Sequence, residues 1–159
     1  MVSITTAQVW DEIAKANFAV VGMVNSNAQA RTTGVVIVTQ DHAVYFASEP
    51  KAWKIRHIAA NPQVSVTVAI PKHVPFLPMI KVPAATITFH GTATVLDAKD
   101  VAPDLLRRLT GGTKDNGEAL TAMAVVEIVP EGDFVTYGVG LRVDKMRNTE
   151  LARGRAPVN

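Results

Sequence analysis

The sequence has no cysteine among its 159 residues. Disulfide bridges, thiolate nucleophiles and cysteine metal sites are therefore excluded. Charge is also scarce: charged residues make up 19% of the chain, and the formal net charge is +2 at pH 7. Proteins that bind nucleic acids carry dense clusters of lysine and arginine, so this composition does not favour such a partner. The absence of disulfides fits a cytoplasmic location, which we take as the expectation.

Long apolar runs are missing as well. The longest apolar runs, such as Ala19–Val24, are far too short to cross a bilayer. The segment Met1–Lys15 lacks the continuous apolar stretch of a secretory signal. Hydrophobic residues nevertheless make up 48% of the chain, enough for the core of one domain. We therefore expect a soluble domain without a membrane partner.

The pattern of apolar and β-branched residues predicts a mainly β (α+β) domain with a few short helices. Six strands are predicted over residues 18–25, 31–39, 43–48, 64–70, 86–96 and 122–129, with a further extended piece over 134–139. Helices are predicted over 5–17, 53–60 and 100–109. The first begins at a capping box formed by Thr5 and Gln8. A meander followed by returning strands favours an antiparallel six-stranded barrel over a parallel sheet.

Two segments stand apart from this pattern. Residues 71–83 contain four prolines and several large apolar side chains, so we expect this loop to rest on a ligand, a partner or its own core. Residues 142–159 form a basic tail of unassigned role, which follows a predicted barrel domain over 1–141. Gly91, in the middle of a predicted strand, indicates a bulge or a sharp bend.

The segment after the third predicted strand has the composition of a phosphate site. Ser48 ends the strand, and Lys51 and Lys54 flank the start of a helix that contains Trp53. The N–H groups and the dipole at a helix N-terminus favour an anion, a hydroxyl can donate a hydrogen bond, and lysines add positive charge. The same pattern also describes an ordinary solvated helix end, so the residues alone leave both interpretations open.

This segment resembles the phosphate-binding element of the flavin split-barrel family related to pyridoxamine 5'-phosphate oxidase. Ser48, Lys54 and Asn61-Pro62 match that element. Residues 29–36 match the strand that follows the edge of the isoalloxazine ring, and 90–95 match a strand that packs the barrel. The resemblance covers about residues 5–129 and implies a six-stranded split barrel. It also implies a set of cofactor-binding residues, namely Arg31, Thr32, Thr33, Val35, Ser48, Lys51, Trp53 and Lys54.

The resemblance further implies an FMN-dependent oxidoreductase that acts on a small-molecule substrate, as a homodimer with the cofactor at the interface. Two alternatives stay open. The first is a deazaflavin-dependent reductase, whose longer anionic cofactor would need the positive charge of Lys51, Arg56, Lys72 and Lys81. The second is a non-catalytic protein that binds flavin or haem. No catalytic residue is assigned, and no metal is predicted, because metal-site spacing is absent among His42, His57, His73 and His90.

Overall fold

The fold is seen in a computed structural model that describes residues 2–74, 79, 82–111 and 122–159. In this part of the chain a single sheet holds eight strands. They are β1 (Phe18–Val24), β2 (Ala30–Val36), β3 (Val38–Gln40), β4 (Ala43–Ser48), β5 (Gln63–Ile70), β6 (Ala85–Asp97), β7 (Ala124–Tyr137) and β8 (Arg153–Pro157). The described helices are α1 (Thr6–Lys15), α2 (Trp53–Ala60), α3 (Pro103–Leu109) and α5 (Thr149–Ala152), with short 3-10 turns η1 (Ala98–Asp100) and η2 (Lys145–Arg147).

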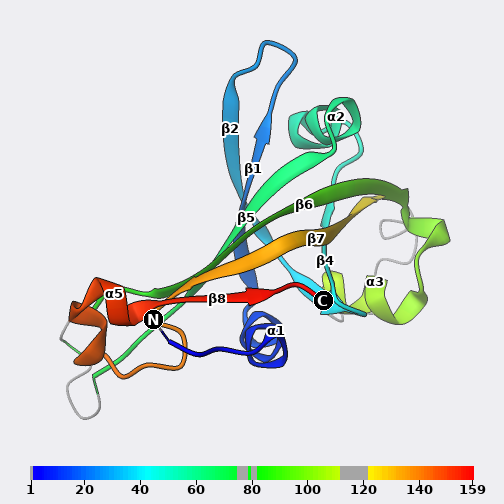
Figure 1. Ribbon diagram of the computed structural model, residues 1–159. Coiled ribbons are helices and arrows are strands. Elements are labelled where there is room, and N and C mark those ends of the chain that lie inside the picture. Colours follow the sequence, from blue (N-terminus) through cyan, green and yellow to red (C-terminus); the bar gives the residue numbers. More distant parts are fainter. Residues whose placement is uncertain (1, 75–78, 80–81, 112–121) are drawn as a thin grey trace.

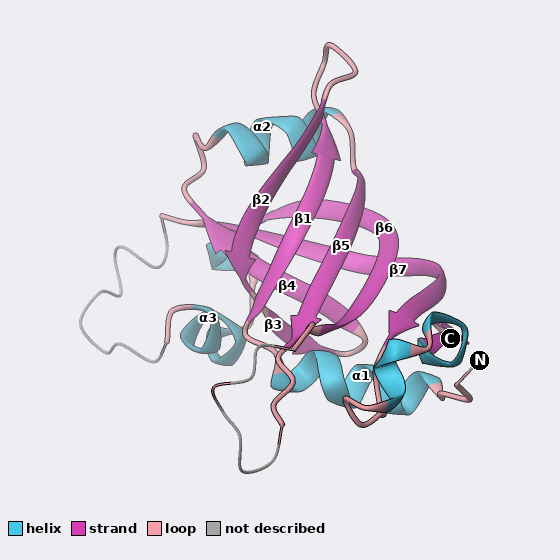
Figure 2. Cartoon of the chain, turned by 90° about the vertical axis from the view of Figure 1, so that its left-hand side faces the viewer, coloured by secondary structure: helices cyan, strands magenta, loops and turns pink. Residues whose placement is uncertain are grey.

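The sheet curls into a split barrel because its two edge strands, β2 and β3, are halves of one chain segment (Figure 2). The strand order is β2-β1-β5-β6-β7-β4-β3, with β8 added beside β7, and all these pairings are antiparallel. Only Ile37 separates β2 from β3, and its N–H donates to the carbonyl of Asn17 at 3.1 Å. The mainly β, split-barrel prediction is confirmed, whereas the count of six strands was wrong.

Alternating side chains build the core inside the barrel. In β5, for example, Val64, Val66 and Val68 are buried while Ser65 points outward. Helices cover both ends, with α2 at one end and α1 at the other (Figure 2). The large, fully buried side chains come from α1, α2 and five strands, and the largest are Phe46, Phe134, Ile13, Ile58, Ile87 and Ile128. Each contributes roughly 1.5–3 kcal/mol by leaving water.

Strand β7 joins two segments that the sequence separates. Separate extended segments were predicted over 122–129 and 134–139, yet β7 runs without interruption through Pro130 and Gly132 between them. Two features accommodate this irregularity. The pairing register shifts on the neighbouring strand β6 between Thr88 and His90, and Gly132 has a positive φ of 72°. Gly91, on β6, allows the backbones of β6 and β7 to approach each other closely. A Cβ at this position would lie 2.3 Å from a backbone oxygen of β7.

The end of the tail belongs to the sheet. Strand β8 pairs with the second half of β7, and β4 pairs with the first half, so both share one edge of this long strand. Val2 forms a parallel bridge with Gly154 on the other side of β8. The sequence did not predict β8, because arginines alternate there with a glycine and an alanine and give little apolar signal. No described helix is long and apolar enough to span a membrane.

Candidate functional site

The turn between β4 and α2 carries the predicted phosphate-binding residues. Ser48 is the last residue of β4 and is only 7% exposed. The turn closes where the N–H of Ala52 donates to the carbonyl of Glu49 at 3.0 Å. Ala52 is also the N-cap of α2, and its side chain makes no capping hydrogen bond. The N–H of Ile55 donates to the carbonyl of Ala52 at 3.1 Å. Alanine has no side-chain acceptor for the N–H groups of Trp53 and Lys54, which are therefore offered to an external acceptor.

Two lysines flank this helix end, and one carboxylate, the exposed Glu49, lies in the turn before it. Lys51 is exposed in the turn and Lys54 is half-buried in the first turn of α2, which contains no acidic residue. The ring of Trp53 is 37% exposed and lies 5.4 Å from the ring of His57, one turn further along the helix. The end of α2 thus combines open donors, two lysines and an accessible aromatic surface, which suits an anionic aromatic ligand.

The predicted ring contacts lie on β2, at an edge of the sheet. Arg31 and Thr32 are exposed and Thr33 is half-buried, whereas the side chain of Val35 points into the core. Only β1 pairs with β2 among the described strands, so backbone groups along its other side are available to a ligand. The opposite edge strand, β3, is covered instead of open. Helix α3 contacts it, and Arg108 of that helix donates to the carbonyl of Thr39 at 2.9 Å.

A shallow groove of about 320 Å³ starts from β2 and crosses the outer face of the sheet. Arg31 and Thr32 line it together with Ser65 and His90 from β5 and β6. Gly22 keeps the groove open, because a Cβ there would lie 2.5 Å from the hydroxyl of Ser65. Sequence reasoning missed Ser65 and His90 as groove residues. Strand alternation places both on the outer face, but the cross-strand register that brings them beside Thr32 is not visible in the sequence.

The two predicted segments lie at the same end of the barrel. Helix α2 contacts β1, the partner of β2, and β2 itself approaches β4, which leads into α2. In Figure 2 the helix sits beside the upper part of β1 and β2. The structure therefore brings the open end of α2 and the open edge of β2 into one region of the molecule.

The other predicted charges are divided. Arg56 is exposed on α2, whereas the ammonium of Lys72, which follows β5, donates to the carbonyl of Leu141 at 3.3 Å. Lys81 falls outside the described residues. The histidine ring of His42 stacks on Trp10 at 5.3 Å. Within the described residues, no group of three or more histidines or carboxylates could hold a metal ion.

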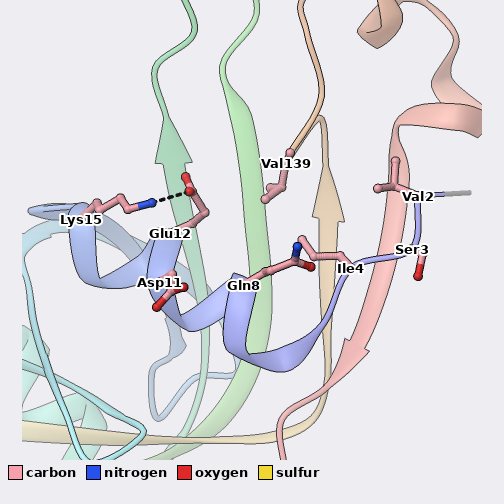
Figure 3. Close-up of a pocket in the computed structure, with 9 residues that line it drawn as sticks. Val2, Ser3, Ile4, Gln8, Asp11, Glu12, Lys15 and Val139 are labelled. Carbon is pink, nitrogen blue, oxygen red and sulfur yellow. Dashed lines mark hydrogen bonds and ion pairs between the residues drawn. The ribbon is translucent and has the colours of Figure 1, made fainter.

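A separate small cavity of about 220 Å³ lies beside α1 (Figure 3). Val2, Ile4 and Val139 form its apolar side, and polar residues of α1 form the other. There Lys15 and Glu12 are 2.8 Å apart, and this hydrogen bond raises the pKa of the lysine. None of the predicted cofactor residues lines this cavity, so it is not part of the candidate site.

Comparisons with known proteins agree on the fold. The family model described as pyridoxamine 5'-phosphate oxidase matches residues 5–144. The haem storage protein HutZ from Vibrio cholerae has a TM-score of 0.65 at 13% identity, over 84% of this chain and 95% of that one. The conserved hypothetical protein Rv2991 from Mycobacterium tuberculosis gives 0.62 at 15% identity, over 81% and 82%. An F420 reductase gives 0.56 at 15% identity, over 78% and 93%. No curated protein sequence matches the chain significantly.

Proposed function

Because this chain belongs to the pyridoxamine 5'-phosphate oxidase family, we propose that it binds FMN and acts as a flavin-dependent oxidoreductase on a small-molecule substrate. One observation carries the proposal. The uncapped, lysine-flanked end of α2 and the open edge of β2 share one end of the barrel. A phosphorylated aromatic cofactor needs both features, an anion site for its phosphate and hydrogen-bonding groups for its ring.

The phosphate is held at the start of α2. Ser48 donates a hydroxyl hydrogen bond, the N–H groups of the first helical turn add backbone donors, and Lys51 and Lys54 supply charge. The half-buried position of Lys54 matters most, because a lysine partly withdrawn from water interacts more strongly with a phosphate than an exposed one.

The ring lies along β2. Arg31, Thr32 and Thr33 offer side-chain and backbone groups to its polar edge, and Val35 contributes through its backbone because its side chain is buried. Trp53 lines the same region. Bound flavin supplies the hydride chemistry, while the protein orients the ring and limits the access of water.

A second copy of the chain completes the site in this proposal. The outer face of the sheet has a row that runs from Val20 through Thr67 and Thr88 to Val135, and none of these residues is charged. Phe18 beside this row is 49% exposed. Exposed apolar surface on neighbouring strands is typical of an interface, and twofold pairing is the commonest solution.

A deazaflavin is the second candidate cofactor. It is favoured by the likeness to an F420 reductase, and exposed Arg56 on α2 could meet a longer anionic tail. A titration with both cofactors separates the two, since tight binding of FMN without affinity for the deazaflavin removes this candidate. Binding of haem in place of either would instead support a non-catalytic binding role, by likeness to the haem storage protein HutZ.

The phosphate site is tested by titrating the protein with FMN and following flavin fluorescence. We expect Lys54→Ala to weaken binding by about tenfold or more, as the loss of a charge-assisted hydrogen bond does. Lys15→Ala is the matched control, because Lys15 is an exposed lysine paired with Glu12 on α1, at the opposite end of the barrel from α2. Equal affinities of the two variants would contradict the proposed site.

The dimer is tested by light scattering. Val20→Asp places a carboxylate in the uncharged row and should yield monomers. Leu151→Asp makes the same change at an exposed apolar residue on α5 and should leave the dimer intact. A monomeric parent protein at micromolar concentration would refute the interface, as would a Val20→Asp variant that remains dimeric.

A further inference from the structure

A second, larger cavity lies where the stretch 141–147 meets the ends of the 71–83 loop. In Figure 1 this stretch leads into α5, at the end of the sheet away from α2. The volume of the cavity is about 590 Å³, within the range of roughly 300–1,000 Å³ that is usual for small-molecule sites. Two segments form its walls, the start and end of the 71–83 loop and the stretch 141–147. We call it the barrel-end cavity; its lining residues are Lys72, His73, Val74, Val82, Leu141, Arg142, Val143, Asp144 and Arg147.

The 141–147 wall is held rigidly in place. Met146 at its centre is 3% exposed, and its carbonyl accepts a hydrogen bond of 2.8 Å from the hydroxyl of Tyr137. The N–H of Gly138 donates to the carbonyl of Ala152 at 2.8 Å, which ties the residues just before the wall to the end of α5. This wall is therefore preformed, and ordering it costs a ligand little affinity.

The lining combines apolar surface with an excess of positive charge. Four half-buried aliphatic residues line it, namely Val74, Val82, Leu141 and Val143. Three cations face a single carboxylate, and that carboxylate, Asp144, already lies 3.5 Å from Arg142. The hydrogen bond of Lys72 to the carbonyl of Leu141 keeps its ammonium at the wall. Arg147 has no ion-pair partner among the described residues.

We infer that the barrel-end cavity binds an amphipathic organic anion, a compact apolar body with one carboxylate or similar group. The aliphatic residues cover the apolar body, and Arg147 with Lys72 receives the anionic group. Arginine is suited to this task because its planar fork matches a carboxylate. The inference does not depend on the proposed cofactor, since this cavity shares no residue with the α2 and β2 site.

The inference is tested by isothermal titration of the full chain with decanoate, decanol and decylamine at monomeric concentrations, without flavin. The three probes share one alkyl chain and differ only in the headgroup. We expect decanoate to bind at least about tenfold more tightly than decanol, with decylamine weakest, as a charge-assisted contact predicts. Methyl resonances of Leu141 and Val143 should shift with decanoate, which locates the site.

Variants then identify the headgroup contact. Arg147→Gln should remove most of the preference for decanoate over decanol while leaving decanol binding unchanged. Arg107→Gln is the control, because Arg107 is exposed on α3 and paired with Asp104 at another end of the molecule. Equal binding of decanoate and decanol, equal effects of the two variants, or binding to anionic vesicles without binding of monomeric decanoate would each overturn the inference. Failure of FMN to bind would not affect it.

Discussion

Replacing Gly138 with alanine tests how the wall of the barrel-end cavity is held. Gly138 has a φ of +69°, and an added Cβ would lie 2.4 Å from the terminal methyl carbon of Met146 and 3.0 Å from its sulfur. Gly140, two residues along, has a φ of +72°, but a Cβ there would have no atom within 4 Å. The two glycines thus share a left-handed backbone and differ only in what surrounds them.

This difference sets the expected magnitudes. A left-handed conformation costs an alanine about 1–2 kcal/mol at either position. Overpacking against a buried side chain adds roughly 1–3 kcal/mol, and only Gly138→Ala meets this cost. We therefore expect Gly140→Ala to lower the free energy of unfolding by about 1–2 kcal/mol, and Gly138→Ala to lower it by about 2–5 kcal/mol as the two effects combine.

Urea unfolding followed by circular dichroism measures both free energies, provided that the dependence on urea is the same in both variants. The Met146 methyl resonance should move in Gly138→Ala and stay in place in Gly140→Ala. The affinity for decanoate should fall with the first variant alone. Equal losses of stability would refute the reasoning, because they would mean that Met146 does not pack against Gly138.

Three further predictions concern the rest of the fold. Burial, followed by the 2.5 Å hydrogen bond to Glu127, raises the pKa of Tyr45 from 10.0 to about 12. The folded protein therefore keeps a proton that the unfolded chain releases, so stability is complete below pH 10 and falls by up to about 3 kcal/mol between pH 10 and 12. Tyr45→Phe should flatten this fall in pH-dependent urea unfolding, and an unchanged slope would contradict the assignment. Thr5→Ala removes the side-chain half of the capping box with Gln8 and should cost about 1 kcal/mol in the same assay; a loss near zero would argue against the cap. Gly91→Ala should prevent the close contact of β6 with β7 and cost more than about 3 kcal/mol, seen as a lower thermal midpoint, whereas a neutral result would show that the strands can separate without penalty.

Local patterns in the sequence predicted much of the fold. Alternating valines identified β5, the capping box identified the start of α1, and Pro62 marked the end of α2. These signals depend on neighbouring residues alone. The 71–83 loop was expected to rest on other groups, and its described ends do line the barrel-end cavity, although residues 75–78 and 80–81 lie outside the described part.

Features that depend on distant contacts escaped prediction. The bend at Ile37 that sends one segment to both edges of the sheet carries no turn residue. Strand β8 is stabilised by its pairing with β7 rather than by its own composition. The groove residues Ser65 and His90 are neighbours through cross-strand register alone. The candidate cofactor residues came from the resemblance to a family, and their roles stay predictions.

The measurement that tests the central proposal most directly compares FMN with riboflavin, which lacks the phosphate. Both are titrated against the protein while backbone amide resonances are recorded. If the start of α2 holds the phosphate, FMN binds about a hundredfold more tightly than riboflavin, as two charge-assisted contacts predict. The amides of Trp53 and Lys54 then shift with FMN alone. Equal affinities for the two flavins, or no binding of either, would contradict the account.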